Sequence, residues 1–128
     1  MVAHRRDEIV LVVEDNAALA ELVQHQLALL GYASITAGTA DEALHVLRSD
    51  ARVDLLFSDI KLPGSLDGRG LALAALALRP GLACLLTTGY EETDTVARRK
   101  TGHIRVLAKP YRRAARAGAV RDALASTR

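Results

Sequence analysis

Side chains that bind cations or phosphoryl groups stand directly after the apolar runs of this 128-residue sequence. Glu14 and Asp15 follow the first run, Asp59 follows the third, Thr88 follows the fourth and Lys109 follows the last. Three clustered carboxylates repel one another and need a cation, and oxygen ligands of this kind suit Mg²⁺. An aspartate beside Mg²⁺ and a lysine can act as a nucleophile toward a phosphoryl group, because both cations offset the charge of that group.

Each of these residues also has an ordinary structural explanation. Asp15 or Asn16 is suited to cap a helix, Asp59 precedes a Pro-Gly turn sequence, and Lys109 alone would be a solvated charge. The combination favours a site, since all of them follow strand ends in the order that a phosphoacceptor needs. Gly89, directly after the hydroxyl, leaves room for a phosphoryl group to approach.

The elements that must position these residues are read from the spacing of apolar residues, which alternates along the chain between a strand pattern and a helix pattern. Short β-branched and apolar runs indicate buried strands, and apolar residues at a spacing of three and four indicate helices. Such alternation predicts βαβ units and a parallel sheet, with ligands at the carboxyl ends of the strands. We expect strands at 9–13, 33–37, 53–58, 82–87 and 104–108, and helices at 16–30, from Thr39 onward, at 67–78 and at 112–125.

The helices carry recognisable ends and faces. Thr39 with Glu42 makes a capping-box pattern, and Gly31 is suited to end the first helix. We expect the first helix to face inward with Leu19, Leu22, Val23, Leu27 and Leu30, and the second with Ala43, Leu44 and Leu47. The segment 91–102 holds only two apolar residues, so we expect a helix there to be short and mobile or partly unwound.

Length and composition restrict the possible classes. One domain fills 128 residues, with 50% hydrophobic and 3% aromatic residues, and no apolar run approaches the length of a membrane helix. The N-terminus does not read as a secretory signal. The single cysteine, Cys84, lies in an apolar strand, excludes an internal disulfide and fits a reducing cytoplasm. Residues 1–97 carry 7 basic and 14 acidic groups, whereas 98–128 carry 10 basic and 1 acidic. That basic end is either a solvated helix or a docking face for an acidic partner.

Other phosphate-handling and metal-binding classes fit poorly. The stretch EDNAALAE after the first run has no glycine, which excludes P-loop and dinucleotide sites. Its two carboxylates would repel a flavodoxin's phosphate, and a haloacid-dehalogenase-type phosphatase would want a second aspartate at Lys61. The four histidines have no zinc spacing.

Four motifs carry a family resemblance over nearly the whole chain: LVVEDN (11–16), FSDIKLPG with LDG (57–68), LLTTGY (85–90) and LAKPY (107–111). The sequence resembles the receiver domain of two-component response regulators. The implied fold is a flavodoxin-like (βα)5 three-layer α/β sandwich with strand order 2-1-3-4-5, spanning 9–125 between tails 1–8 and 126–128. The stretches LPGSLDGRGLA and LLTTGY are similar in sequence to receivers associated with hybrid sensor histidine kinases.

The resemblance also implies a role for each site residue. Asp59 would be the phosphoacceptor. The chain would not be an enzyme, because it would assist only the transfer of a phosphoryl group to its own Asp59. Mg²⁺ would be held by Glu14, Asp15, Asp59 and the backbone carbonyl of Lys61, and the phosphoryl group by Thr88, Gly89 and Lys109, with Pro110 after a cis bond. The implied donor is a sensor histidine kinase or a histidine phosphotransfer protein. The implied output is a protein contact in the cytoplasm, without nucleic acid or membrane.

Three positions depart from the family pattern or modulate the site. Val106 stands where receivers commonly carry an aromatic switch residue. It leaves open an alternative, a receiver-like interaction module that works without phosphorylation. Lys61 and Tyr90 border the path of a hydrolytic water, and neither is a small amide or carboxylate, so we expect a slowly hydrolysing phosphoryl group.

Overall fold

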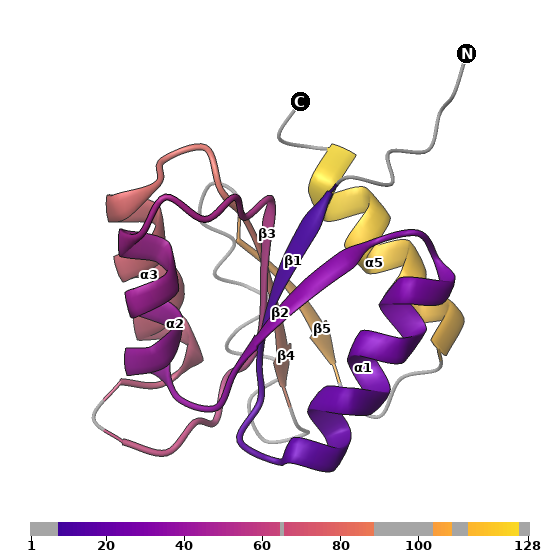
Figure 1. Ribbon diagram of the computed structural model, residues 1–128, viewed down its shortest axis with the longest axis horizontal. Helices are drawn as coiled ribbons and strands as arrows, with labels where there is room; N and C mark the ends of the chain where they lie inside the picture. The colour runs from indigo at the N-terminus through magenta and orange to yellow at the C-terminus, as the bar shows by residue number, and fades with distance from the viewer. Residues whose placement is uncertain (1–7, 65, 89–103, 109–112, 126–128) are drawn as a thin grey trace.

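The computed structural model of the chain describes residues 8–64, 66–88, 104–108 and 113–125 (Figure 1). Its five strands form one parallel sheet in the order β2-β1-β3-β4-β5, which confirms the predicted topology. The strands are β1 (Ile9–Val13), β2 (Ala33–Ala37), β3 (Leu55–Asp59), β4 (Ala83–Thr88) and β5 (Ile104–Ala108), and the helices are α1 (Ala17–Leu29), α2 (Ala40–Arg48), α3 (Gly68–Leu78) and α5 (Arg113–Ala125).

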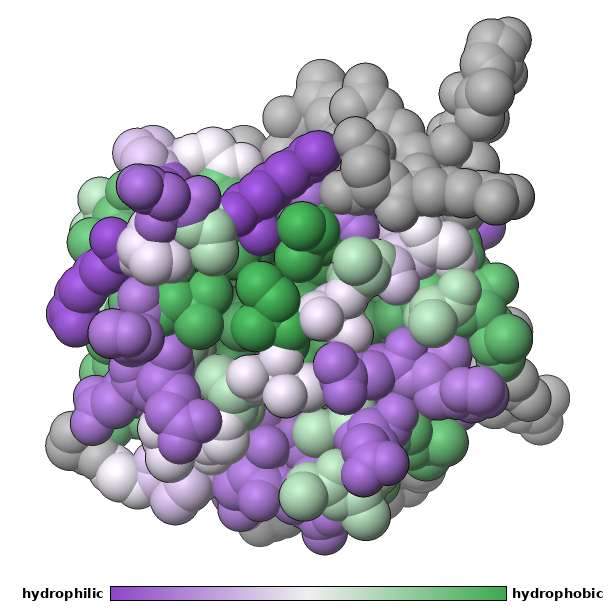
Figure 2. Space-filling view, viewed as in Figure 1, coloured by the Kyte–Doolittle hydropathy of each residue, from purple (hydrophilic) through white to green (hydrophobic). Residues whose placement is uncertain are grey.

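Helices cover both faces of the sheet and make three layers. α2 and α3 lie on one face and α1 and α5 on the other (Figure 1). Alternate strand residues therefore enter two separate cores: Leu11, Leu56 and Leu86 pack toward α2 and α3, whereas Val12 and Leu85 pack toward α1 and α5. Burial on both sides explains why β1 reads as a continuous apolar run. On the face viewed in Figure 2, hydrophobic side chains also gather between α2 and β2.

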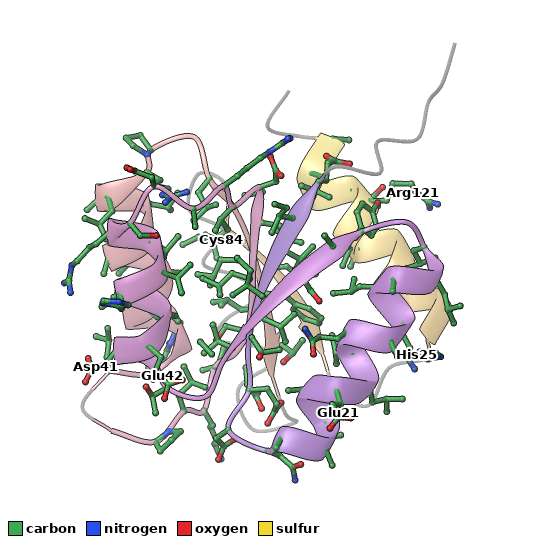
Figure 3. All side chains as sticks on the ribbon, viewed as in Figure 1. Glu21, His25, Asp41, Glu42, Cys84 and Arg121 are labelled. Carbon is green, nitrogen blue, oxygen red and sulfur yellow. The ribbon has the colours of Figure 1, made fainter. Side chains whose placement is uncertain are left out.

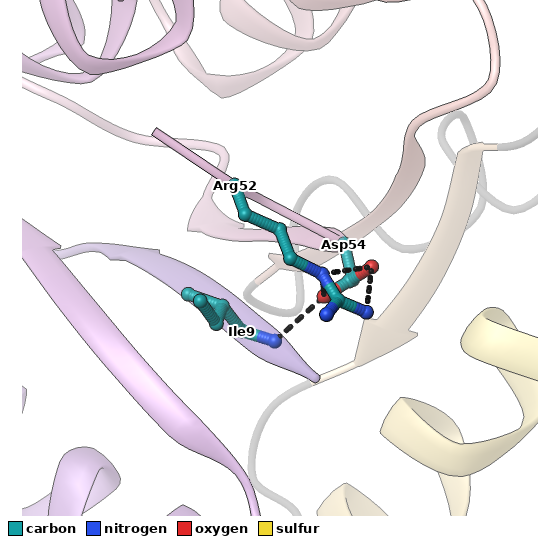
Figure 4. A network of polar contacts seen from close by, with 3 residues as sticks. All are labelled: Ile9, Arg52 and Asp54. Carbon is teal, nitrogen blue, oxygen red and sulfur yellow. Dashed lines mark hydrogen bonds and ion pairs between the residues drawn. The ribbon is translucent and has the colours of Figure 1, made fainter. Parts of the chain in front are cut away.

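Two strands begin later than the sequence predicts, β3 at Leu55 and β4 at Ala83. The reason at β3 is a side chain that takes the place of a ladder bond (Figure 4). The Ile9 N–H donates to Asp54 Oδ2 at 2.8 Å, and the Asp54 N–H donates to the Ile9 carbonyl, also at 2.8 Å. Arg52 pairs with the same carboxylate, Nε lying 3.1 Å from Oδ2. Val53 is buried but precedes the strand.

Side-chain caps begin three of the described helices. Asn16, Thr39 and Asp67 each accept a hydrogen bond from a backbone N–H in the first turn of the helix that follows. At α2 the Thr39 hydroxyl accepts from the Glu42 N–H at 3.1 Å, and Glu42 Oε1 accepts from the Gly38 N–H at 2.9 Å. This pairing confirms the predicted cap. The segment 91–102 lies outside the described residues.

The predicted inward face of α1 is partly wrong. Its buried residues are Ala20, Val23 and Leu27, whereas Leu19 and Leu22 are 46% and 47% exposed. Each of these leucines precedes a buried residue by one position, which places it about 100° around the helix. A single layer of sheet covers only the stripe spaced i, i+3, i+7, so the neighbouring leucines remain at the surface. Across the described residues, no helix combines the length and apolarity needed to cross a membrane.

Candidate functional site

The turn between β1 and α1 places two acidic residues at the carboxyl edge of the sheet. The Glu14 N–H donates to the Ala37 carbonyl of β2 at 3.0 Å, which holds the turn on the sheet. Glu14 Oε2 accepts from the Asn16 N–H at 3.1 Å, and Asn16 Oδ1 in turn caps α1. Glu14 is half-buried and Asp15 is exposed beside it.

Burial and neighbouring acidic groups both act on the carboxyl group of Glu14. The pKa of Glu14 is raised from its ordinary 4.5, first by burial and then by a side-chain hydrogen bond with Asp15 and by the negative charges of Asp59 and Asp15. The hydrogen bond from the Asn16 N–H acts in the opposite direction. Like charges that disfavour one another's ionised forms are relieved by a bound cation.

Asp59 is the last residue of β3 and is fixed by its neighbours on both sides. Its Cα pairs in register with that of Thr87 on β4. The Ser58 hydroxyl donates to the Asp59 carbonyl at 2.9 Å, and the Ile60 N–H donates to the Thr87 carbonyl, also at 2.9 Å. The Asp59 carboxylate is thereby held at the edge where β1, β3 and β4 end.

A close approach of α3 shapes the loop after Asp59. The buried Gly68, first residue of α3, donates its N–H to the Ile60 carbonyl at 2.7 Å. Asp67 caps the same helix end by accepting from the Gly70 N–H at 2.9 Å. The preceding turn includes Gly64 at φ +99°, a conformation that favours glycine. The chain thus returns from Asp59 to α3 with Lys61 exposed on the loop.

The carboxylates present fit a magnesium ion. The described residues hold no group of three or more His, Cys, Asp or Glu side chains arranged around a common point. Mg²⁺ needs less than that, because it keeps several waters and commonly uses one or two carboxylates. The charges of Asp59 and Asp15 add to burial in raising the pKa of Glu14, and a bound cation would offset both effects.

The structure brings together part of the predicted site. Glu14, Asp15 and Asp59 meet at one edge, as predicted. Thr88 is the final residue of β4 and pairs with Ala108 through the backbone, and Val106 pairs with Leu86. The side chains of Thr88 and Val106 are not among those described, and Gly89, Tyr90, Lys109 and Pro110 lie outside the described residues.

Sequence reasoning passed over one side chain that contacts the site. The Thr87 hydroxyl donates to Asp59 Oδ1 at 3.4 Å, and Thr87 is only 3% exposed. A signal was available: Thr87 is the polar exception among the strand positions that share its face, since Ala83 and Leu85 are apolar. The predicted role of Thr88, to hold the phosphoryl group, stays a prediction.

Cys84 takes no part in the site. It is fully buried between the sheet and the α2/α3 layer (Figure 3), and burial raises its pKa to about 12. A thiol that stays protonated is a poor nucleophile and a poor metal ligand. The expected core role of Cys84 is confirmed.

Comparison with curated proteins points to one kind of domain. The chain is 32% identical over 115 residues to the transcriptional regulatory protein GlrR of Escherichia coli, which covers 89% of this chain and 26% of GlrR. It is 36% identical over 103 residues to the response regulator protein FleR of Pseudomonas aeruginosa, 80% of this chain and 21% of FleR. The chain therefore spans about a quarter of the length of each of these two relatives.

Solved structures share the fold along nearly the full chain. A CheY-like response regulator receiver domain protein from Methanospirillum hungatei superposes with a TM-score of 0.81 at 26% identity, covering 94% of this chain and 96% of that one. A receiver domain protein from Clostridium thermocellum gives 0.84 at 22% identity, covering 93% and 95%. The family profile described as the response regulator receiver domain matches residues 10–121. With Asp59 at the carboxyl edge of a 2-1-3-4-5 sheet beside an acidic pair, the chain belongs to the response regulator receiver domain family of two-component systems.

Proposed function

We propose that this chain is a phosphoacceptor domain, in which Asp59 receives a phosphoryl group from a sensor histidine kinase or a histidine phosphotransfer protein. The observation that carries the proposal is geometric: Glu14 and Asp15 follow β1, and Asp59 ends β3, the strand paired with β1, so all three lie at the same edge of the sheet. A stable core alone gives no reason to place acidic residues at neighbouring strand ends. A site that binds a cation and then an anion does explain acidic residues at one edge of the sheet.

Four groups would hold the cation: the carboxylates of Glu14, Asp15 and Asp59, and the backbone carbonyl of Lys61. When bound, Mg²⁺ supplies charge neutralisation for the carboxylates and the incoming phosphoryl oxygens. The chain contributes the arrangement, because the hydrogen bonds of Glu14 to Ala37 and Asn16 fix the β1–α1 turn beforehand. Preorganisation of this kind removes reorganisation from the reaction itself.

The chemical step would need only one nucleophile. A carboxylate oxygen of Asp59 attacks the phosphorus atom, the bond from phosphorus to the donor breaks, and the donor's histidine nitrogen keeps the bonding electrons. Asp59 has no proton to lose, so no general base is required. By the family resemblance, Thr88 and Lys109 would hold phosphoryl oxygens. Lys109 directly follows Ala108, the register partner of Thr88.

The output we propose is a contact with another protein. GlrR is named a transcriptional regulatory protein and FleR a response regulator protein, and this chain matches about a quarter of the length of each. We assign the receiving step to these residues. We place it in the cytoplasm, in keeping with a single free cysteine that is buried.

The test is a titration of the purified chain with beryllofluoride, a phosphoryl mimic, in the presence and absence of Mg²⁺. We expect stoichiometric bound fluoride resonances by ¹⁹F NMR only when Mg²⁺ is present. Asp59→Asn, which removes the attacking oxygen, should show none. Absence of binding to the wild-type chain would overturn the phosphoacceptor proposal.

That negative result would favour a second candidate, an interaction module that works without phosphorylation. The observation behind it is Val106, which lies in the middle of β5 opposite Leu86 where an aromatic switch would be expected. The two functions differ in one property, since only the phosphoacceptor should change its partner affinity on beryllofluoride binding.

A further inference from the structure

Thr87 is the one polar residue among the β4 positions that face α1 and α5. Ala83 and Leu85, which share that face, are buried in the apolar core, and Thr87 itself is 3% exposed. Burying a hydroxyl without a hydrogen bond is costly. A valine would fill the same space without that cost, so we expect the hydroxyl to have a hydrogen-bond partner.

Its hydrogen-bond partner among the described side chains is the phosphoacceptor. The Thr87 hydroxyl donates to Asp59 Oδ1 at 3.4 Å. The two residues are register partners in adjacent parallel strands, so their side chains leave the sheet on the same face. The Ile60 N–H donates to the Thr87 carbonyl and ties the two strand ends together. A β-branched side chain is also stiff about χ1, which keeps the hydroxyl aimed in one direction.

We propose that Thr87 is a positioning residue for Asp59, and this inference rests on the proposed phosphoacceptor function. By donating to Oδ1, the hydroxyl would orient the carboxylate so that Oδ2 faces the incoming phosphorus atom. With acetyl phosphate as donor, the Oδ2–phosphorus bond forms and the bond from phosphorus to the acetyl oxygen breaks. Acetate leaves with the bonding electrons, and no proton is transferred. After transfer, Oδ1 is the carbonyl oxygen of the acyl phosphate and still accepts from Thr87.

The length of the bond predicts a moderate effect. A hydroxyl-to-oxygen hydrogen bond is usually 2.5–3.0 Å long, so at 3.4 Å this one is weak. A hydrogen bond to a carboxylate contributes more than a neutral one when its length is ordinary, so this lengthened bond should change a rate constant by roughly three- to tenfold. We expect that reduction in Thr87→Val, which replaces the hydroxyl by a methyl group of the same size. Thr87→Ser keeps the hydroxyl and should remain within about twofold of the wild-type chain by the same reasoning.

The experiment compares the wild-type chain, Thr87→Val and Thr87→Ser in two measurements. The first is the rate constant of phosphorylation by acetyl phosphate at saturating Mg²⁺, with urea unfolding midpoints to show that both variants fold. The second needs neither metal nor phosphoryl donor. It is the infrared carboxylate band of Asp59 in protein with ¹³C-labelled aspartate, assigned by its absence from the Asp59→Asn variant. The frequency of this band should shift in Thr87→Val and return to the wild-type value in Thr87→Ser.

The outcomes separate the two proposals. Slow phosphorylation and a shifted band in Thr87→Val, with both restored in Thr87→Ser, would support the positioning role. Wild-type rates in Thr87→Val, or a Thr87→Ser variant as slow as Thr87→Val, would overturn that role and leave the phosphoacceptor function standing. A wild-type chain that takes up no phosphoryl group would overturn the proposed function, and the positioning role with it.

Discussion

Gly68 lies directly against the backbone of Asp59. A Cβ atom at position 68 would overlap the Asp59 carbonyl oxygen and come within 2.7 Å of the Ile60 Cα. These are backbone atoms of the strand end that carries the candidate phosphoacceptor, and they cannot swing aside as a flexible side chain would. The start of α3 therefore determines where β3 ends, and with it the position of the Asp59 carboxylate.

We predict that Gly68→Ala damages both the fold and the candidate site. The added methyl group must push α3 away from β3, which costs about 1–3 kcal/mol of unfolding free energy, as for other overpacked positions. Urea denaturation measures this loss, and beryllofluoride binding should weaken with it. Gly81→Ala is the matched control, since no atom lies within 4 Å of its added Cβ. Equal unfolding midpoints for the two variants would contradict the close-approach argument.

The acidic edge makes stability depend on pH through Glu14. Its pKa is raised in the folded chain, mainly by burial and then by the neighbouring acids, so the fold binds that proton more tightly than the unfolded chain does. The resulting stabilisation is fully present below the ordinary pKa of 4.5. It is lost as the pH rises through the raised value, because Glu14 then ionises beside Asp15 and Asp59.

We therefore expect Glu14→Gln to unfold at higher urea than the wild-type chain at pH 7 without metal, with a difference that shrinks as the pH falls toward 4.5. Glu21→Gln is the control, because Glu21 is an exposed glutamate on α1 (Figure 3). Added Mg²⁺ should stabilise the wild-type chain more than Glu14→Gln, since a ligand stabilises the state that binds it. A Glu14→Gln variant less stable than the wild-type chain at pH 7 would contradict the argument that burial and neighbouring acids together disfavour the ionised form of Glu14.

Most of the helices and strands could be predicted from local patterns in the sequence. Thr39 and Asp67 cap the helices that their positions predict, and the apolar run of β1 marks a strand covered on both faces. The contacts that were not predicted are those between residues far apart in the chain. The bond from Thr87 to Asp59 spans 28 positions and that from Ile9 to Asp54 spans 45, and no periodicity reports such a pair.

The Ile9–Asp54 contact gives a prediction about stability alone. Asp54→Ala would leave the Ile9 N–H without its acceptor at the amino ends of β1 and β3, opposite to the phosphoacceptor edge. Loss of a hydrogen bond to a charged group costs about 1.5–3 kcal/mol. Arg52→Ala should cost less than about 1 kcal/mol, because the Arg52 side chain is 47% exposed and such ion pairs contribute little. Urea unfolding distinguishes the two, and phosphorylation by acetyl phosphate should be unchanged in both; a reversed order would refute this assignment.

The last prediction concerns the lifetime of the phosphoryl group. Hydrolysis requires a water molecule to approach in line with the bond between phosphorus and Asp59. Lys61, two residues after Asp59, is exposed on the loop that leads to α3, and Tyr90 follows Thr88 by two residues. An ammonium group over the phosphoryl oxygens and a bulky ring over the opening would both obstruct the water. Neither side chain resembles the small amide or carboxylate that would orient it for attack.

We therefore expect slow loss of the phosphoryl group, which suits a relay or a store more than a rapid switch. The measurement is the decay of ³²P-labelled protein at fixed Mg²⁺, with Lys61→Asn and Tyr90→Ala expected to lose label faster than the wild-type chain. Arg121→Asn removes an exposed positive charge on α5 (Figure 3) and should decay at the wild-type rate. If the wild-type chain loses label as fast as both site variants, the shielding argument is wrong. If Arg121→Asn accelerates decay as much as Lys61→Asn, net charge and not local obstruction controls the lifetime.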